Sequence, residues 1–175
     1  MPSVHDLSTE NADHAIVHKC RFIEFMPSGI TAMAWAPASS KTKLLAVARE
    51  NGEIQLWNPK GSSWYLEKKI AGSKYSPIES ILFIHQSKLR LIAASLDGRV
   101  LEFSLDGLRV IQEADSYGGG VWSMAANQMQ TRLAIGCEDG VIRILDIEEG
   151  NLIYLKSLER YWVQLKLDMM VELYH

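Results

Sequence analysis

The feature that most constrains the fold of this chain is a hairpin pattern that occurs three times. A short apolar run is followed by an Asn-Gly or Asp-Gly pair and then by a run in which apolar and polar residues alternate. Such a pair favours a tight turn between two strands, because the turn needs positive φ at its central residues. The three copies occupy residues 45–58, 91–104 and 133–146.

The spacing of the copies predicts the architecture. The turn glycines Gly52, Gly98 and Gly140 follow one another at 46 and 42 residues. A short opening strand precedes each hairpin and a fourth strand follows it. The openers are expected at 30–35, 78–83 and 121–126, and the fourth strands at 64–70, 108–113 and 152–158. Repeats of this length with four antiparallel strands are typical of blades, whose two apolar faces must stack against neighbouring blades.

One residue departs from the pattern. Glu102 stands where Leu56 and Ile144 stand in the other copies. A buried carboxylate is costly unless it is paired. Glu102 is therefore expected either to reach the rim of the sheet or to meet a partner that the sequence does not identify.

Composition and charge exclude several classes of protein. The formal charge of the 175-residue chain is −3, which gives no basic excess of the kind that marks many nucleic-acid-binding domains. Cys20 and Cys137 lie far apart without ligands at metal spacing, so neither a disulfide framework nor a zinc site is expected. With no secretory signal and no apolar run long enough for a bilayer, we expect a soluble intracellular protein.

The repeats resemble the WD-repeat pattern. Trp57-Asn58, Phe103-Ser104 and Leu145-Asp146 stand at the signature dipeptide, although the Gly-His pair that usually opens such repeats is absent. The resemblance implies an all-β fold of WD-repeat β-propeller blades. We expect three four-stranded blades plus an extra N-terminal strand within 16–25, which together make an incomplete propeller.

A narrower resemblance is to the cirhin family of nucleolar WD-repeat proteins of the small-subunit processome. It is carried by residues 18–22 leading into 27–30, and by 117–126 followed by 136–140. It implies a non-enzymatic scaffold in ribosome biogenesis and small-subunit ribosomal RNA processing, located in the nucleolus of the nucleus. The implied partners are other processome proteins and pre-ribosomal RNA, with no cofactor, membrane or small-molecule substrate.

The match covers residues 16–160 and sets the expected domain organisation. The predicted segments are a flexible lead-in at 1–15, a partial propeller at 16–160 with repeats at about 29–72, 77–117 and 120–160, and a divergent tail at 161–175. Since typical propellers have about four to eight blades, a three-blade array is expected to leave apolar sheet faces uncovered.

No catalytic, cofactor-binding or metal-binding residue is predicted. Gly118-Gly119-Gly120 lacks the Lys-Ser or Lys-Thr of a phosphate loop and is interpreted as a turn between blades. The acidic pairs at 138–139 and 146–149 are interpreted as solvated turn residues, and Cys137 as a core residue. The five histidines, at positions 5, 14, 18, 85 and 175, are scattered without a nucleophile motif.

Two sets of side chains remain as candidate contact residues. Four tryptophans at strand positions are predicted to pack in the core rather than to stack on bases: Trp35, Trp57, Trp64 and Trp122. A basic set could contact RNA phosphates from one rim, against the alternative of an ordinary solubilising surface. It comprises Lys41, Lys43, Lys68, Lys69, Lys74, Lys88 and Arg90.

Two other functions compete with the scaffold. One is a WD-repeat adaptor of another complex, such as a substrate receptor of a cullin-based ubiquitin ligase. Such receptors tend to carry an Asp-Arg pair just after the signature dipeptide, and residues 58–59, 104–105 and 146–147 do not supply it. The other is a propeller-fold enzyme, which would need convergent acid, base or metal-binding residues at the central axis.

Overall fold

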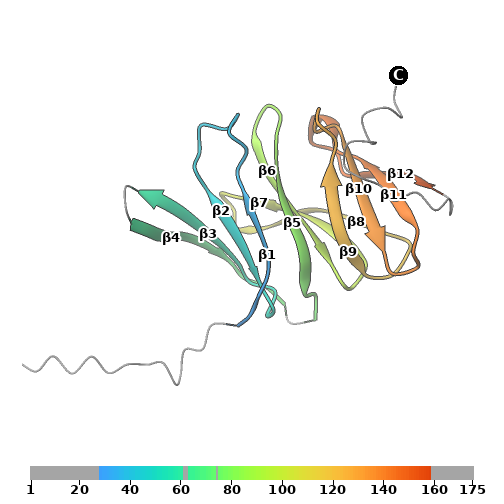
Figure 1. Cartoon of the computed structure of the whole chain (residues 1–175), viewed down its shortest axis with the longest axis horizontal. Helices are drawn as coiled ribbons and strands as arrows, with labels where there is room; N and C mark the ends of the chain where they lie inside the picture. The colour runs from blue at the N-terminus through green and yellow to red at the C-terminus, as the bar shows by residue number, and fades with distance from the viewer. Residues whose placement is uncertain (1–27, 61–62, 74, 159–175) are drawn as a thin grey trace, which may run out of the picture.

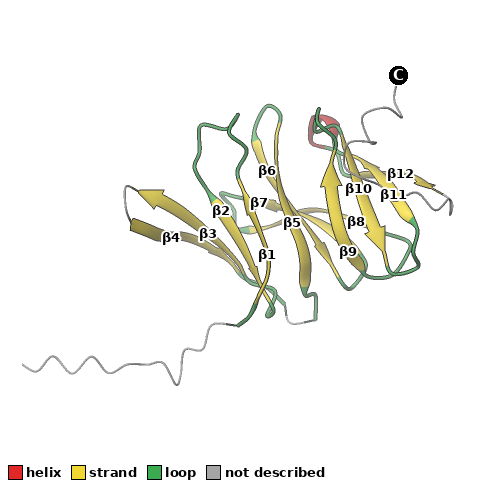
Figure 2. Cartoon of the chain, viewed as in Figure 1, coloured by secondary structure: helices red, strands yellow, loops and turns green. Residues whose placement is uncertain are grey.

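The computed structural model describes residues 28–60, 63–73 and 75–158, and these residues form β-sheets (Figures 1 and 2). The one helical segment among them is a single 3₁₀ turn, η2 (Glu148–Gly150). In this part of the chain, no helix has the length and apolar character needed to cross a membrane.

Twelve strands form three four-stranded antiparallel sheets within the described residues. The first sheet contains β1 (Ile30–Trp35), β2 (Leu45–Arg49), β3 (Ile54–Lys60) and β4 (Ser63–Ile70). The second contains β5 (Ile78–His85), β6 (Leu89–Ser95), β7 (Arg99–Ser104) and β8 (Arg109–Asp115). The third contains β9 (Val121–Ala126), β10 (Arg132–Cys137), β11 (Ile142–Asp146) and β12 (Ile153–Leu158). Within each sheet the strands follow chain order, which confirms the repeat predicted from the sequence.

The turn glycines have the conformation that the hairpin pattern predicts. Gly52, Gly98 and Gly140 have φ of 78°, 89° and 76°, a region in which a Cβ atom is strained. At Gly52 a Cβ would also lie 2.6 Å from the carbonyl oxygen of Ser73, whereas at Gly140 it would meet nothing within 4 Å. The first turn is therefore fixed by a close approach between backbones as well as by its own dihedral angles.

The sheets stack face to face, with β5 of the second sheet lying between β1 and β9 (Figure 1). Two hydrophobic cores fill the two interfaces. The core between the first and second sheets includes Ala46, Leu56, Phe83, Leu91 and Phe103. The core between the second and third sheets includes Ile92, Ala94, Val100, Leu133, Ile135 and Cys137. Both faces of the second sheet are thus covered, as expected for a blade that stacks between two neighbours.

The sequence has mostly polar residues at 85–90, but the loop between β5 and β6 is shorter than this range. His85 pairs with Leu89 and Ile84 pairs with Arg90, so only residues 86–88 lie outside the ladder of β5 and β6. The polar side chains at both ends made this part of the hairpin look like a loop in the sequence. The strand expected within 16–25, the lead-in at 1–15 and the tail at 161–175 lie outside the described residues.

Candidate interaction surfaces

One rim of the blades is a connected set of loops. The loops after β1, β5 and β9 lie at the same end of the molecule (Figure 1). His85 Nδ1 and Ser39 Oγ are 3.0 Å apart, which links the first blade to the second. The backbone N–H of His85 donates to Gln130 Oε1 at 2.6 Å, and Gln86 Nε2 donates to the carbonyl oxygen of Gln130 at 2.7 Å. These contacts fix the three loops relative to one another.

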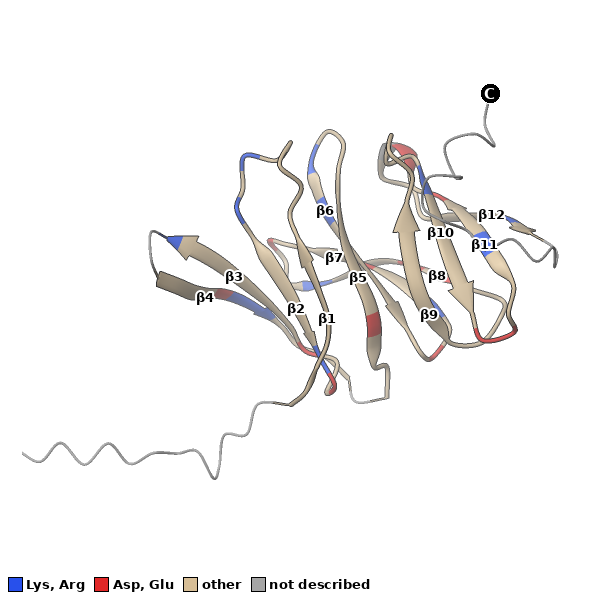
Figure 3. Cartoon of the chain, in the orientation of Figure 1, with Lys and Arg blue, Asp and Glu red and all other residues tan. Residues whose placement is uncertain are grey.

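Lysines give this rim its charge. Lys41, Lys43 and Lys88 are exposed on the loops after β1 and β5, and no carboxylate among the described residues forms an ion pair with them (Figure 3). Cations that are not already neutralised remain available to an anionic partner. We call these three side chains the basic rim.

The rest of the predicted basic set lies elsewhere. Lys68 donates to the carbonyl oxygen of Leu105 at 2.8 Å and lies 3.4 Å from Asp106. Lys69 Nζ lies 3.5 Å from a Glu53 oxygen. Both lysines belong to the outer strand β4 and not to a loop. Lys74 lies outside the described residues.

For Arg90 the prediction of a surface cation is wrong. Its side chain is 2% exposed and forms a two-point ion pair with the equally buried Glu102, at 2.9 and 2.7 Å. The guanidinium group also donates to the carbonyl oxygens of Ile147 and Asn151 in the third blade. Arg90 is therefore the partner that the sequence did not identify for Glu102, and the pair joins two blades. The complementary charges at 90 and 102 are the signal from which this pairing could have been inferred.

The opposite rim consists of the tight turns and the connections between blades, and it is acidic and paired (Figure 3). Burial raises the pKa of Asp97, but hydrogen bonds from Arg99, Ser76 and Ser95 outweigh it, so the pKa of this carboxyl lies below its ordinary value. In the third blade Arg143 donates hydrogen bonds to the carboxylate of Asp139, and these raise the pKa of the Arg143 guanidinium. These carboxylates stabilise turns, as the sequence predicts for 138–139.

The three glycines at 118–120 form the connection between the second and third blades. Arg143 donates to the carbonyl oxygen of Tyr117 at 3.0 Å, and a Cβ at Gly118 would lie 2.2 Å from the guanidinium group. The N–H of Gly120 donates to Glu138 Oε2 at 3.2 Å. This is a turn between blades, and it is held by side chains of the neighbouring hairpin.

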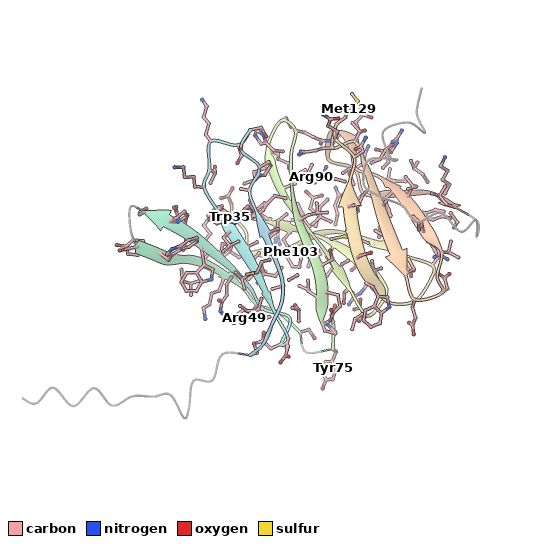
Figure 4. All side chains as sticks on the ribbon, viewed as in Figure 1. Trp35, Arg49, Tyr75, Arg90, Phe103 and Met129 are labelled. Carbon is pink, nitrogen blue, oxygen red and sulfur yellow. The ribbon has the colours of Figure 1, made fainter. Side chains whose placement is uncertain are left out.

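Three of the four tryptophans are exposed, which contradicts their prediction as core residues. Trp35, which is labelled in Figure 4, is 55% exposed. Trp64 and Trp122 are 50% and 57% exposed, and Trp57 is half-buried. The rings of Trp35 and Trp64 lie 5.6 Å apart on the outer side of the first sheet. The sequence correctly predicts apolar residues at these positions. It does not show which sheet faces are covered by another blade, and within the described residues no blade covers the outer side of the first sheet.

A groove of about 370 Å³ lies between the first two blades. Its lining includes the apolar side chains of Leu44, Phe103 and Ile111 and the cations Lys68 and Lys88. Within the described residues, no group of three His, Cys, Asp or Glu side chains could hold a metal ion. Cys137 is buried in the second core, as predicted. Of the five histidines only His85 lies in the described part of the chain.

Three four-stranded antiparallel blades with tight Asn-Gly or Asp-Gly hairpins and an exposed rim of loops have the architecture of WD-repeat β-propeller blades. A family model, the WD40 domain of anaphase-promoting complex subunit 4, matches residues 83–165.

The particular similarity is to U3 small nucleolar RNA-associated protein 4. The chain is 34% identical to that protein of Saccharomyces cerevisiae over 146 residues, covering 79% of this chain and 19% of the relative. It is 31% identical to the Homo sapiens homologue, covering 82% and 20%, and 35% identical to the Schizosaccharomyces pombe protein, covering 77% and 20%. These relatives support the cirhin resemblance. The chain spans about a fifth of their length.

Proposed function

We propose that the chain is a non-enzymatic scaffold of the small-subunit processome that acts in ribosome biogenesis and small-subunit ribosomal RNA processing in the nucleolus. The observation that carries the proposal is the similarity across all three blades to proteins named for their association with U3 small nucleolar RNA. Exposed sheet faces and connected rim loops support a docking role, since both offer contact area without a reactive group.

The test is affinity purification of the tagged chain from nucleolar extract, followed by sequencing of the RNA that co-purifies. We expect enrichment of U3 small nucleolar RNA and pre-ribosomal RNA over an unrelated WD-repeat protein. Recovery of ubiquitin ligase subunits without these RNAs would instead support the cullin-based adaptor. The absence of both would contradict the processome assignment.

We further propose that the basic rim contributes a direct contact to RNA phosphates. Lys41, Lys43 and Lys88 are exposed cations on loops that are held together, and phosphate contacts by such side chains dominate the affinity of proteins for nucleic acids. Neutralised phosphates release counterions, so binding is expected to weaken as salt rises.

A matched pair of triple variants tests this contact. Replacing Lys41, Lys43 and Lys88 with Ala is expected to reduce the slope of log affinity against log salt by about 2 for a fluorescent U3 RNA fragment. The control replaces three exposed cations of the outermost strands with Ala: Lys69, Arg109 and Lys156. Equal effects of the two triple variants would show that the contact is non-specific and would contradict a role for the basic rim.

A further inference from the structure

The groove between the first two blades, which we call the interblade groove, combines an apolar lining with the basic rim. Both outer strands, β4 and β8, contribute to it, and so do the loops after β1 and β5. Its apolar lining consists of Leu44, Leu89, Phe103, Leu105 and Ile111. The groove belongs to two consecutive blades whose strands are all described, so its lining is defined by the interface between them.

A β-bulge in each outer strand supplies one residue of this lining. The ladder between β7 and β8 skips Ile111, which lies opposite no residue of its neighbour. The ladder between β3 and β4 skips Glu67 in the same way. Bulges re-aim a side chain and are common next to functional sites. Here both extra residues line the same groove although they come from different blades, and Ile111 is 45% exposed in it.

Most charges that line the groove already have a partner within the molecule. Arg90 and Glu102 form their buried ion pair, and Lys68 lies 3.4 Å from Asp106. Glu67 accepts a hydrogen bond at 2.9 Å from the side chain of an asparagine on β3. These groups are therefore not available as charges for a ligand.

Lys88 is the exception among the cations of the lining. It is exposed, and no carboxylate among the described residues forms an ion pair with it. Thr42 also lines the groove, and its chain neighbours Lys41 and Lys43 are the other two cations of the basic rim. The interblade groove thus joins an apolar surface to cations that are complementary to an anionic group.

The lining favours a peptide over the bases of RNA. Proteins usually hold unstacked bases on aromatic rings. Among the described residues, Phe103 supplies the one aromatic ring of the lining, and it is 6% exposed within the first core. An aliphatic side chain with a carboxylate beside it matches the surface instead. The volume of about 370 Å³ falls within the range of about 300–1,000 Å³ for ligand sites, which suits a few side chains of an extended segment.

We propose that the interblade groove binds an acidic peptide segment of a partner protein, with an apolar side chain of the segment against Ile111 and its carboxylates at Lys88 and the rest of the basic rim. The proposal goes beyond the scaffold function, because it names the chemistry of a protein partner and the surface that holds it. It shares Lys88 with the proposed RNA contact, and the variants below separate the two.

Fluorescence anisotropy of the full chain with dye-labelled synthetic peptides tests the chemistry of the occupant. The probe is a short Gly-Ser peptide with one Leu followed by three Glu. One control peptide has Ser in place of the Leu, and another has Gln in place of each Glu. We expect the probe to bind with a dissociation constant below about 1 mM and each control peptide to bind at least about tenfold more weakly.

Two results with the unaltered chain would overturn the proposal. Absence of probe binding is the result expected if residues outside the described part of the chain, or RNA alone, occupy the groove. Equal binding of the probe and either control peptide would show that the groove does not read an apolar side chain together with carboxylates. Neither result depends on a variant that must fold.

Two serine substitutions at neighbouring positions of β8 locate the site. Ile111→Ser removes an apolar side chain from the groove and is expected to raise the dissociation constant of the probe about tenfold. Val110→Ser is the matched control, because Val110 is 42% exposed on the same strand and is not part of the groove lining. It is expected to bind the probe like the unaltered chain, and both variants should keep the same circular dichroism spectrum. Equal affinities of the two variants would place the peptide elsewhere and contradict the proposal.

Lys88→Ala and the RNA readout complete the test. Removing this cation is expected to raise the dissociation constant of the probe about threefold and to weaken its salt dependence, and no change would overturn the charge contact. Ile111→Ser should leave the binding of the fluorescent U3 RNA fragment unchanged, because phosphate contacts use cations. Loss of RNA binding in Ile111→Ser would show that RNA occupies the groove and would overturn the peptide site. Peptide binding without any RNA binding would support the peptide site and contradict the RNA contact alone.

Discussion

At the scale of single residues, the buried ion pair between Arg90 and Glu102 distinguishes the second blade from the first. At the same two repeat positions the first blade has Leu44 and Leu56, both in its core. Breaking a buried pair by removing one partner leaves an unpaired charge and costs about 3–5 kcal/mol. An apolar pair avoids that cost.

We therefore expect Glu102→Leu and Arg90→Leu each to lower the free energy of unfolding by about 3–5 kcal/mol. The double variant is expected to lose less than either, about 1–3 kcal/mol, because only the bonds from Arg90 to the carbonyl oxygens of Ile147 and Asn151 are lost without replacement. Urea denaturation measures all three. Additive losses in the double variant would contradict the pairing.

The buried thiol of Cys137 makes the stability of the protein depend on pH. Burial raises the pKa of its thiol above the ordinary value of 9.0. The folded protein thus keeps this proton to a higher pH than the unfolded chain does. The free energy of unfolding therefore falls as the pH rises above about 9, and it stops falling once the pH exceeds the pKa of the thiol in the folded protein. At pH values below the pKa of the thiol in the unfolded chain, the thiol is protonated in both states and does not make stability depend on pH.

In a Cys20→Ser background, we expect Cys137→Ala to reduce the loss of stability between neutral pH and pH values above 9, measured by urea denaturation at each pH. The comparison removes the contribution of Tyr and Lys residues, which titrate in both proteins. Iodoacetamide should label Cys137 in the parent only after urea is added. Rapid labelling of the native protein would contradict the burial of this thiol.

At the scale of elements, the hairpin turns differ in what a side chain would meet. Gly52 and Gly140 both have positive φ, but only Gly52 also lies against the backbone of Ser73. Gly140→Ala should cost about 1–2 kcal/mol from the left-handed conformation alone. Gly52→Ala should cost clearly more, because the backbone contact must shift as well. Thermal denaturation compares the two, and equal losses would contradict the importance of the close approach between the backbones of Gly52 and Ser73.

The strands could be predicted from sequence because their signals are local. The Asn-Gly and Asp-Gly turns fix the register, and period-two alternation then assigns each side chain to one face or the other. Which face is covered is not a local property. Trp35 and Phe83 occupy the same repeat position, yet Phe83 is 6% exposed and Trp35 is 55% exposed, because a blade packs on one and not on the other.

The basic set shows the same limit. Arg90 and Lys88 are two residues apart, but the chain enters the β6 ladder between them, and only Lys88 stays at the surface. Composition does not distinguish the two, since the burial of Arg90 depends on Glu102 and on two carbonyl oxygens of the third blade. Non-local partners of this kind decide which predicted contact residues are available.

At the scale of the whole molecule, the blades form a short array in which each contacts only its neighbours. Stability in such arrays is a sum of the units and of the interfaces between them. The second blade takes part in both interfaces, whereas the first and third blades take part in one each. The centre of the array is therefore expected to be its most stable part.

Native-state hydrogen exchange should reveal this order along the chain. In β6, Leu91 and Ala93 belong to one core while Ile92 and Ala94 belong to the other, and all four are 0% exposed. Exchange at these amides requires the loss of both interfaces, so we expect their opening free energy to approach the global value of about 5–15 kcal/mol. The outermost strands β4 and β12 should exchange faster, because most of their side chains are exposed. Protection in β4 that equals that of β6 would mean that the blades open together, and the description of the molecule as a chain of neighbouring units would then be wrong.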